Sequence, residues 1–318
     1  MTNRSLVLLS GEGSTIPAAE AKALFFAYDP QAKFEEPEPR VLLSESDAAP
    51  DLVSRRVAFS RRVGRLLSSP GEASEFLEGR TFRFRSFDLS PKATQVDPRK
   101  TLEGIEGRID LRSPDFEITL VRGRREYLAL TRPMQMLQDW SLRRPRKRAF
   151  FHPSAIFPKL SRALFNLTRC TEGQAFVDPF CGTGSIPLEA FIVGARVLAS
   201  DRDSRMTRGG LANMRRFDQQ WEGVIRCDAM SLPLTRVDAV ATDIPYGRLS
   251  STRGSDASKV AEGFMGTLSE ALRPGGRAVV MHPQQVPLKG SGSVSIDEEH
   301  HLYVHKLLTR TITVLRRS

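Results

Sequence analysis

The chain has 318 residues, a formal net charge of +10 at pH 7, 3 cysteines and 40% hydrophobic residues. These values exclude a disordered, collagen-like or disulfide-rich chain and allow two domains that each bury a core. No run approaches the ~18 consecutive apolar residues of a membrane span, and the first residues lack the pattern of a signal peptide. We therefore expect a cytoplasmic protein without a membrane partner. Because the cysteines are widely spaced and form no paired motif, we expect no metal site.

The charge is unevenly distributed along the chain. Residues 1–50 carry a net charge of −4, residues 51–150 carry +9 and residues 151–318 carry +5. Arginine supplies 38 of the 47 basic residues, and its planar guanidinium suits phosphate groups and stacked bases. Charge alone leaves two alternatives open, a nucleic-acid-binding face and a solvated basic linker. The densest basic run consists of Arg143, Arg144, Arg146, Lys147 and Arg148.

The first 70 residues predict a small α/β unit. Residues 6–9 and 41–44 are apolar runs typical of strands, and residues 17–27 place Ala, Leu and Phe on one helical face. We interpret residues 63–67 as a further helix.

The pattern changes after residue 80. Residues 81–87 alternate Phe with Arg, a period of two that predicts a strand with one apolar and one cationic face. Residues 116–121 and 126–131 predict a strand pair joined by the Arg-rich turn at residues 122–125. We interpret this region, up to about residue 140, as an α+β module.

Strands and helices alternate regularly in the second half of the chain. A helix at residues 158–167 opens the series, and such alternation predicts a parallel, doubly wound sheet. Two final strands, at residues 302–305 and 310–315, predict an antiparallel pair at one edge. The other expected strands are residues 175–178, 196–200, 224–227, 239–242 and 277–282, and the other expected helices are residues 185–193, 204–217 and 258–272.

The first strand of this sheet leads into a glycine turn, Asp178-Pro-Phe-Cys-Gly182-Thr-Gly184. Glycines at such a turn let a ligand approach the backbone and expose the amides of the following helix. Pro187 stands where a dinucleotide fingerprint has its third glycine, which speaks against a bound pyrophosphate. Asp178 can accept from a cationic ligand such as an amino-acid ammonium. A tight turn without a ligand is the alternative.

Two further acids follow the next strands. Asp201 ends the second strand, where a carboxylate can accept from both hydroxyls of a ribose. Asp228 ends the third strand, where an adenine amino group is a plausible partner. Each acid alone is more often a helix cap, but three of them at successive strand ends predict a nucleoside-containing ligand.

The fourth strand ends in Asp243-Ile244-Pro245-Tyr246-Gly247. The Asp243 carboxylate and the Ile244 carbonyl can accept the two N–H groups of a planar exocyclic amine, while Tyr246 stacks on the base. The alternative is an Asx-type turn with a packed tyrosine.

These motifs resemble those of a known enzyme class. Residues 178–184 (DPFCGTG), Asp201, Asp228 and residues 243–247 (DIPYG) are similar to motifs I to IV of Rossmann-like amino-methyltransferases that depend on S-adenosylmethionine. Residues 152–167 resemble the segment before motif I in archaeal tRNA guanine-10 N2-methyltransferases.

The resemblance extends over nearly the whole chain. Residues 55–60 and 80–133 look like that family's THUMP RNA-binding domain, and residues 9–12 with the following helix look like its N-terminal piece. Ile244 departs from the family, which usually has the first of two prolines there. Because only the carbonyl is needed at this position, the resemblance still implies amine binding.

The resemblance implies an α/β fold, in which an α+β THUMP-containing RNA-binding region precedes a Rossmann-like methyltransferase sheet that is mostly parallel with an antiparallel edge. The implied domains are an N-terminal α/β (ferredoxin-like) piece at 1–48, a THUMP domain at 49–140, a basic linker at 141–157 and a methyltransferase domain at 158–318. The implied reaction transfers methyl from S-adenosylmethionine to the N2 amine of guanosine 10 in tRNA, once or twice. The partner is tRNA, and no protein subunit is implied.

A covalent role for Cys181 is disfavoured, because such a cysteine attacks pyrimidine rings rather than serving an Asp-x-Pro-Tyr site.

The site residues fall into three groups. The expected catalytic residues are Asp243, Pro245 and Tyr246; the expected cofactor-binding residues are Asp178, Phe180, Gly182, Gly184, Asp201, Asp228 and Ala229; and the expected substrate-binding residues are Ile244, Arg143, Arg144, Arg146 and Lys147.

Three other functions compete with this interpretation. An amino-methyltransferase of another RNA, or of adenine or cytosine in DNA, would use the same Asp-x-Pro-Tyr loop. A nucleotide-dependent dehydrogenase shares the sheet and the Asp201 signal, but Pro187 and the loop at residues 243–247 weigh against it. A non-catalytic RNA-binding protein is disfavoured by the acids at all four strand ends.

Overall fold

A computed structural model of the chain describes residues 3–12, 14–89, 96–133, 140–217, 222–245, 254–305 and 308–318. The chain forms two compact units, one of residues 1–13 and 17–138 and the other of residues 14–16 and 139–318. No helix within the described ranges is long and apolar enough to cross a membrane.

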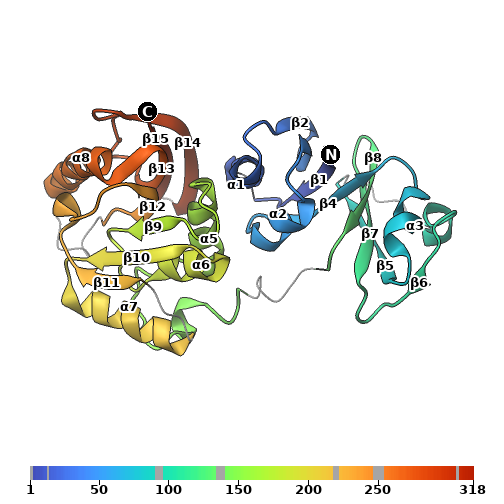
Figure 1. Cartoon of the computed structure of the whole chain (residues 1–318), viewed down its shortest axis with the longest axis horizontal. Coiled ribbons are helices and arrows are strands. Elements are labelled where there is room, and N and C mark those ends of the chain that lie inside the picture. Colours follow the sequence, from blue (N-terminus) through green and yellow to red (C-terminus); the bar gives the residue numbers. More distant parts are fainter. Residues whose placement is uncertain are drawn as a thin grey trace. The chain divides into compact units, whose positions relative to one another are not determined.

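The described part of the first unit is built on an eight-stranded mixed sheet in the order β2-β3-β1-β4-β8-β7-β5-β6 (Figure 1). Helix α1 packs Leu24 and Phe25 against Val7, Leu42 and Val53, which anchors one end of the sheet in a buried apolar cluster. The elements are β1 (Asn3–Leu9), α1 (Ile16–Tyr28), β2 (Lys33–Glu38), β3 (Val41–Ser46), α2 (Pro50–Arg56), β4 (Ser60–Leu67), α3 (Glu72–Leu77), β5 (Thr81–Asp88), α4 (Pro98–Thr101), β6 (Arg108–Ile109), β7 (Phe116–Arg122) and β8 (Glu126–Thr131).

Strand β4 corrects the helix expected at residues 63–67. Residues 63–67 belong to this strand rather than to a helix, because β1 and β8 pair with it on both sides and satisfy its backbone. Gly64 allows β8 to approach closely, since a side chain there would collide with the Leu130 carbonyl. The β1–β4 pairing also places residues of the expected 1–48 piece and of the expected 49–140 domain in one sheet.

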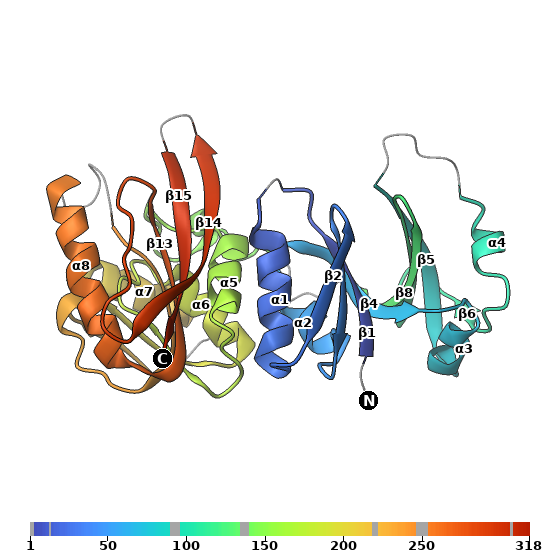
Figure 2. The same ribbon diagram turned by 90° about the horizontal axis from the view of Figure 1, so that it is seen from above.

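The described part of the second unit contains a seven-stranded sheet in the order β11-β10-β9-β12-β13-β15-β14. The first five strands in this order pair in parallel, whereas β13, β15 and β14 pair antiparallel, as the sequence predicts. Figure 2 shows helix α8 on one face of this sheet and helices α5 and α6 on the other. The elements are η2 (Pro145–Lys147), α5 (Pro158–Leu167), β9 (Ala175–Asp178), α6 (Ser185–Val193), β10 (Arg196–Asp201), α7 (Ser204–Arg216), β11 (Gly223–Arg226), η3 (Ala229–Ser231), β12 (Val237–Asp243), α8 (Gly254–Ala271), β13 (Leu272–Pro283), β14 (Val294–His305) and β15 (Leu308–Arg317).

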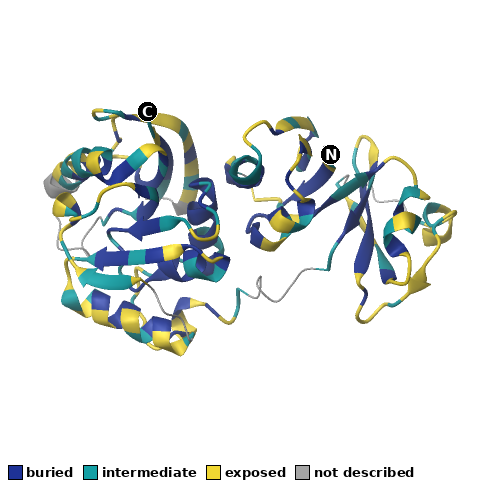
Figure 3. Ribbon diagram, in the orientation of Figure 1, coloured by how far each residue is buried: buried dark blue, intermediate teal, exposed yellow. Residues whose placement is uncertain are grey.

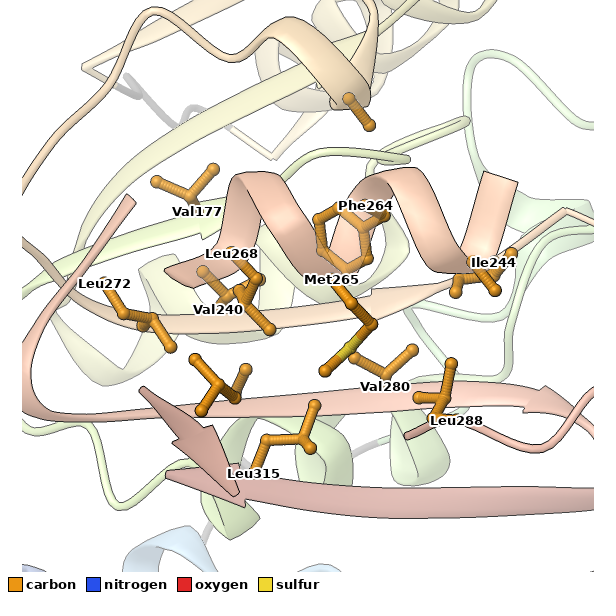
Figure 4. Close-up of a cluster of buried hydrophobic side chains, with 14 of the residues drawn as sticks. Val177, Val240, Ile244, Phe264, Met265, Leu268, Leu272, Val280, Leu288 and Leu315 are labelled. Atoms are coloured by element: carbon orange, nitrogen blue, oxygen red, sulfur yellow. The ribbon is translucent and has the colours of Figure 1, made fainter. Parts of the chain in front are cut away.

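The central strands of the second unit are buried (Figure 3). Between α8 and the sheet, Phe264 and Leu268 pack with Val240, Val280 and Leu315 in one apolar cluster (Figure 4). Parallel strands end at the same edge of a sheet, so this packing holds the carboxyl ends of β9, β10 and β12 beside one another.

Residues 141–157, the expected basic linker, belong to the second compact unit. Arg143 and Arg148 are buried, and the backbone of Phe150 is hydrogen-bonded to Asn213 on α7. The cause lies on α6, where the fully buried Glu189 accepts from Arg143 at 2.7 Å. A buried carboxylate needs charged partners, and the basic run supplies one of them.

Candidate active site

The glycine turn follows β9. Gly182 has a φ of 51° and Gly184 has a φ of 80°, conformations that glycine adopts without the strain of a side chain. The turn is closed by a hydrogen bond of 2.8 Å from the Gly184 amide to the Cys181 carbonyl, and the Cys181 amide donates to Ser200 of β10. A side chain at Gly182 would meet no described atom within 4 Å, so a ligand has room to approach this backbone.

Asn213 holds the turn from the neighbouring helix, and sequence reasoning missed this residue. Its Nδ2 donates to the Thr183 carbonyl at 2.9 Å and to the Phe150 carbonyl at 3.0 Å, while its Oδ1 accepts from the Phe150 amide at 2.8 Å. An asparagine inside a helix is a weak signal of such a role, because this residue more often caps helices.

Asp201 supports the glycine turn as well as the expected ribose site. Its Oδ2 accepts from the Gly182 amide at 3.0 Å, and its Oδ1 accepts from the Asp203 amide at 2.9 Å. Burial raises the pKa of the Asp201 carboxyl. Each oxygen keeps a second lone pair, so acceptance from ribose hydroxyls is compatible with these bonds.

Asp228 lies at the end of β11 and is exposed. Its Oδ1 accepts from the Met230 amide at 3.0 Å and caps η3. Ala229 is buried in the core against α8, so any contact it makes with a ligand would use its backbone.

Asp178 is buried at the end of β9. Its Oδ1 accepts from the Thr242 hydroxyl at 2.7 Å and from the Phe180 amide at 3.2 Å. Burial raises the pKa of Asp178 to about 8, and the charges of Asp201 and Asp243 act in the same direction. The Phe180 ring packs edge-on against Phe264 of α8, with ring centroids 5.3 Å apart, so its side chain belongs partly to the core.

Asp243 ends β12 beside these acids. Ile244 follows it with a buried side chain in the core and donates its amide to the Met281 carbonyl at 2.9 Å, which fixes the backbone of the loop. Pro245 is half-buried. The third expected catalytic residue, Tyr246, lies outside the described residues.

Arg310 on β15 pairs with Asp243, and sequence reasoning missed it. Its Nη1 donates to Oδ2 of Asp243 at 2.8 Å. The other oxygen, Oδ1, is buried and has no hydrogen-bond partner among the described residues. Burial raises the pKa of Asp243 to about 6, and the charge and hydrogen bond of Arg310 oppose that rise.

The expected phosphate-binding residues of the basic run divide into two sets. Arg144, Arg146 and Lys147 are exposed, as a phosphate contact requires. Arg143 is buried and pairs with Glu189, so its guanidinium serves the fold instead.

Cys181 is buried inside the glycine turn, and burial raises the pKa of its thiol well above its ordinary value. A protonated, buried thiol is a poor nucleophile, which agrees with the expectation that the cysteine has no covalent role.

The sheet order, the glycine turn and the acids at the ends of β9, β10 and β12 define a Rossmann-like methyltransferase, and residues 145–306 match the family described as RMKL-like, methyltransferase domain. A tRNA (guanine(10)-N2)-dimethyltransferase of Methanothermobacter thermautotrophicus is 30% identical to this chain, in an alignment that covers 98% of this chain and 99% of the relative. A relative with the same printed name from Methanocaldococcus jannaschii is 31% identical, covering 66% of this chain and 60% of its own. The chain belongs to the tRNA (guanine(10)-N2)-methyltransferase family.

The fold has a counterpart among solved structures. The crystal structure of TrmN from Thermus thermophilus aligns with 99% of this chain and 100% of its own, with a TM-score of 0.54 and 19% sequence identity. At this identity the likeness concerns the fold.

Proposed function

We propose that this enzyme transfers methyl from S-adenosylmethionine to the N2 amine of guanosine 10 in tRNA. The observation that carries the proposal is Oδ1 of Asp243, a buried acceptor without a partner in the described part of the chain, at the strand end where the family resemblance expects the target amine. A buried acceptor of this kind is costly unless a ligand supplies the donor.

The residues at the strand ends fit S-adenosylmethionine. The open backbone at Gly182 suits close approach of the cofactor, Asp201 would accept from its ribose hydroxyls, and the region of Asp228 and Ala229 would bind adenine. Asp178 would face the positively charged amino-acid part of the cofactor, because a neighbouring cation stabilises the ionised form of a carboxyl whose pKa burial has raised. When bound, the cofactor supplies an electrophilic methyl group.

Asp243 is proposed to orient the amine and to offset charge. Oδ1 would accept one N–H of guanine N2, and the Ile244 carbonyl would accept the other. A nitrogen that gains a methyl group becomes cationic and must lose a proton, so a carboxylate beside it stabilises the transition state more than the ground state. Tyr246 is proposed to stack on the base.

Two parts of the chain are proposed to bind RNA, each within its own unit: the THUMP region at residues 49–140 and the exposed part of the basic run. Arg144, Arg146 and Lys147 would contact phosphate, as would the Arg-rich turn between β7 and β8. Because tRNA is the proposed substrate, we also propose a cytoplasmic location.

Nucleoside analysis tests the proposal. Purified enzyme, tRNA and S-adenosylmethionine with a labelled methyl group are incubated, and the tRNA is digested and resolved by mass spectrometry. We expect label on guanine N2 at position 10, absent when that position is changed to adenosine. Label on adenine N6 or cytosine N4 would keep an amino-methyltransferase but overturn the guanosine assignment, and cofactor binding without transfer to any RNA or DNA would favour a non-catalytic protein.

A further inference from the structure

Arg310 reaches the end of β12 from two strands away. The sheet order places β13 between β12 and β15, and the Arg310 guanidinium crosses β13, with Nη1 lying 3.6 Å from Sδ of Met281. Met281 is the register partner of Asp243, which brings the guanidinium to the Asp243 carboxylate. The side chains of Arg310 and Asp243 are only 18% and 17% exposed, so water screens their ion pair weakly.

The ion pair makes the two oxygens of Asp243 different. Oδ2 is held by Arg310 at 2.8 Å, whereas Oδ1 has no partner within the described ranges. A carboxylate fixed through one oxygen cannot rotate freely, and its second oxygen then has a defined direction. This arrangement suits a residue that must accept one N–H of an amine in a single geometry.

We propose that Arg310 is a positioning residue for methyl transfer, which holds Oδ2 of Asp243 so that Oδ1 is presented to the target amine. This inference rests on the proposed function in assuming that Asp243 binds the amine. It does not depend on which base carries that amine.

The charge of Arg310 adds a second effect. Among the described residues, Arg310 from β15 pairs with Asp243, and the ionisable Asp178 of β9 interacts electrostatically with both Asp243 and Asp201. Burial favours a protonated Asp243, whereas the charge and the hydrogen bond of Arg310 act against protonation. Without Arg310, Asp243 would be protonated over more of the neutral range and would lose the negative charge that offsets the developing charge of the amine.

The test compares Arg310→Gln with Arg310→Lys, and Arg316→Gln serves as a matched control. Arg316 lies on the same strand but its side chain is 55% exposed and faces Asp297. Single-turnover methyl transfer to tRNA is measured for the full chain across acidic and alkaline pH, together with the Kd for S-adenosylmethionine and for tRNA. The wild-type product is identified first, so that a failure of the proposed function is recognised before the variants are compared.

For Arg310→Gln we expect a single-turnover rate about 10-fold or more lower at neutral pH, with both Kd values within about 2-fold of the wild type. The acid limb of its pH–rate profile should move to higher pH by about one unit, since an adjacent opposite charge shifts a carboxyl pKa by roughly that much or more. Arg310→Lys should keep the acid limb near its wild-type position because it keeps the charge. Arg316→Gln should match the wild type.

A double-mutant cycle separates positioning from general structure. In an Asp243→Asn background, Arg310→Gln should cost little further rate, because the carboxylate on which it acts is gone. Equal reductions in rate in both backgrounds would overturn the inference, and so would an Arg310→Gln enzyme with the wild-type rate and acid limb. If Arg310→Gln does not fold, Arg310→Lys provides the test, because it replaces the planar guanidinium with an ammonium group on a shorter side chain. A rate and a tRNA product identical to those of the wild type at every pH would then contradict the need for the guanidinium geometry.

Discussion

The hydroxyl of Thr242 donates a 2.7 Å hydrogen bond to Oδ1 of Asp178, and both residues are buried. Thr242 immediately precedes Asp243 on β12, whereas Asp178 ends β9. The bond therefore links the strand end expected to hold the cofactor to the strand end expected to hold the amine. The same two strands also pair in parallel, with Ala239 opposite Phe176 and Val240 opposite Val177.

Thr242→Val should destabilise the protein. The substitution keeps the shape of the side chain but removes the donor, which leaves a buried acceptor of Asp178 short of a partner and costs about 1 to 3 kcal/mol. Urea unfolding of the variant and the wild type measures the difference. Thr242→Ser, which keeps the hydroxyl, is the control and should lie closer to the wild type. Equal stability of Thr242→Val and wild type would show that the bond contributes nothing.

Cofactor binding at neutral pH should release a proton from Asp178. In the chain without ligand, burial raises the pKa of Asp178 to about 8, so its carboxyl is mostly protonated at neutral pH. A positive ligand beside it favours the ionised form and lowers that pKa. Calorimetry in two buffers with different ionisation heats measures the proton released. The release should vanish in Asp178→Asn and should fade in the wild type as the pH is raised above about 8. Equal binding heats in both buffers near neutral pH would contradict this assignment.

Asp201→Ala should weaken S-adenosylmethionine binding about 10-fold to 100-fold, since two ribose hydroxyls without a charged acceptor cost ~1.5 to 3 kcal/mol. The variant also removes the acceptor of the Gly182 amide, so Asp201→Asn is the informative comparison. Its amide oxygen can still accept from Gly182, but its NH2 group replaces the oxygen that accepts from the Asp203 amide, so a remaining decrease in affinity reports the loss of the charge and of that acceptor together. Asp228→Ala should have a smaller effect because a single adenine contact is at stake. Unchanged affinity in Asp201→Ala would remove the ribose assignment.

Asp243→Ala should slow single-turnover methyl transfer about 100-fold or more, equivalent to roughly 2.7 kcal/mol of barrier, while both Kd values change little. The wild-type rate should fall as the pH drops through about 6, because the pKa of Asp243 lies there and the protonated carboxyl has no negative charge to offset the charge that develops on the amine. Tyr246→Ala should be milder, and Tyr246→Phe nearly silent, if the ring only stacks. Normal turnover by Asp243→Ala would exclude the catalytic role.

The parts of the fold and site that follow local rules are predictable from the sequence. Asp178, Asp201 and Asp243 each end a strand whose apolar run is plain, and parallel strands bring such ends to one edge. The helix at Ser185–Val193 begins directly after its glycine turn, as expected. In these cases spacing along the chain is enough.

Long-range pairs are beyond this kind of reasoning. Arg310 lies 67 positions from Asp243, and Asn213 lies 63 positions from Phe150, so nothing in the neighbouring sequence marks either contact. The basic run around Arg143 predicts a phosphate-binding role for that residue. The buried Glu189 on α6, 46 positions away, decides its environment instead.

The basic run gives a last prediction: its exposed residues should affect tRNA binding, whereas the buried Arg143 should affect the stability of the fold. Neutralising the exposed Arg144, Arg146 and Lys147 together should weaken tRNA binding and reduce the slope of log affinity against log salt, by about 0.7 to 0.9 for each phosphate that the variant no longer neutralises. Unfolding and cofactor affinity should stay at wild-type values. Filter binding of tRNA at several salt concentrations measures the slope.

Arg143→Gln provides the contrast. It leaves the buried Glu189 with one charged partner fewer, although the ion pair with Arg162 remains, with Nη2 of Arg162 2.9 Å from Oε2 of Glu189. Removing one partner of a buried pair costs up to 3 to 5 kcal/mol, and we expect about the lower end because Arg162 remains. This variant should unfold at lower urea concentration while its folded form keeps the wild-type salt slope. If the triple variant kept that slope, the exposed residues would be solvated and the tRNA surface would have to lie elsewhere. If Arg143→Gln changed the slope without changing stability, the buried pairing would not describe its role.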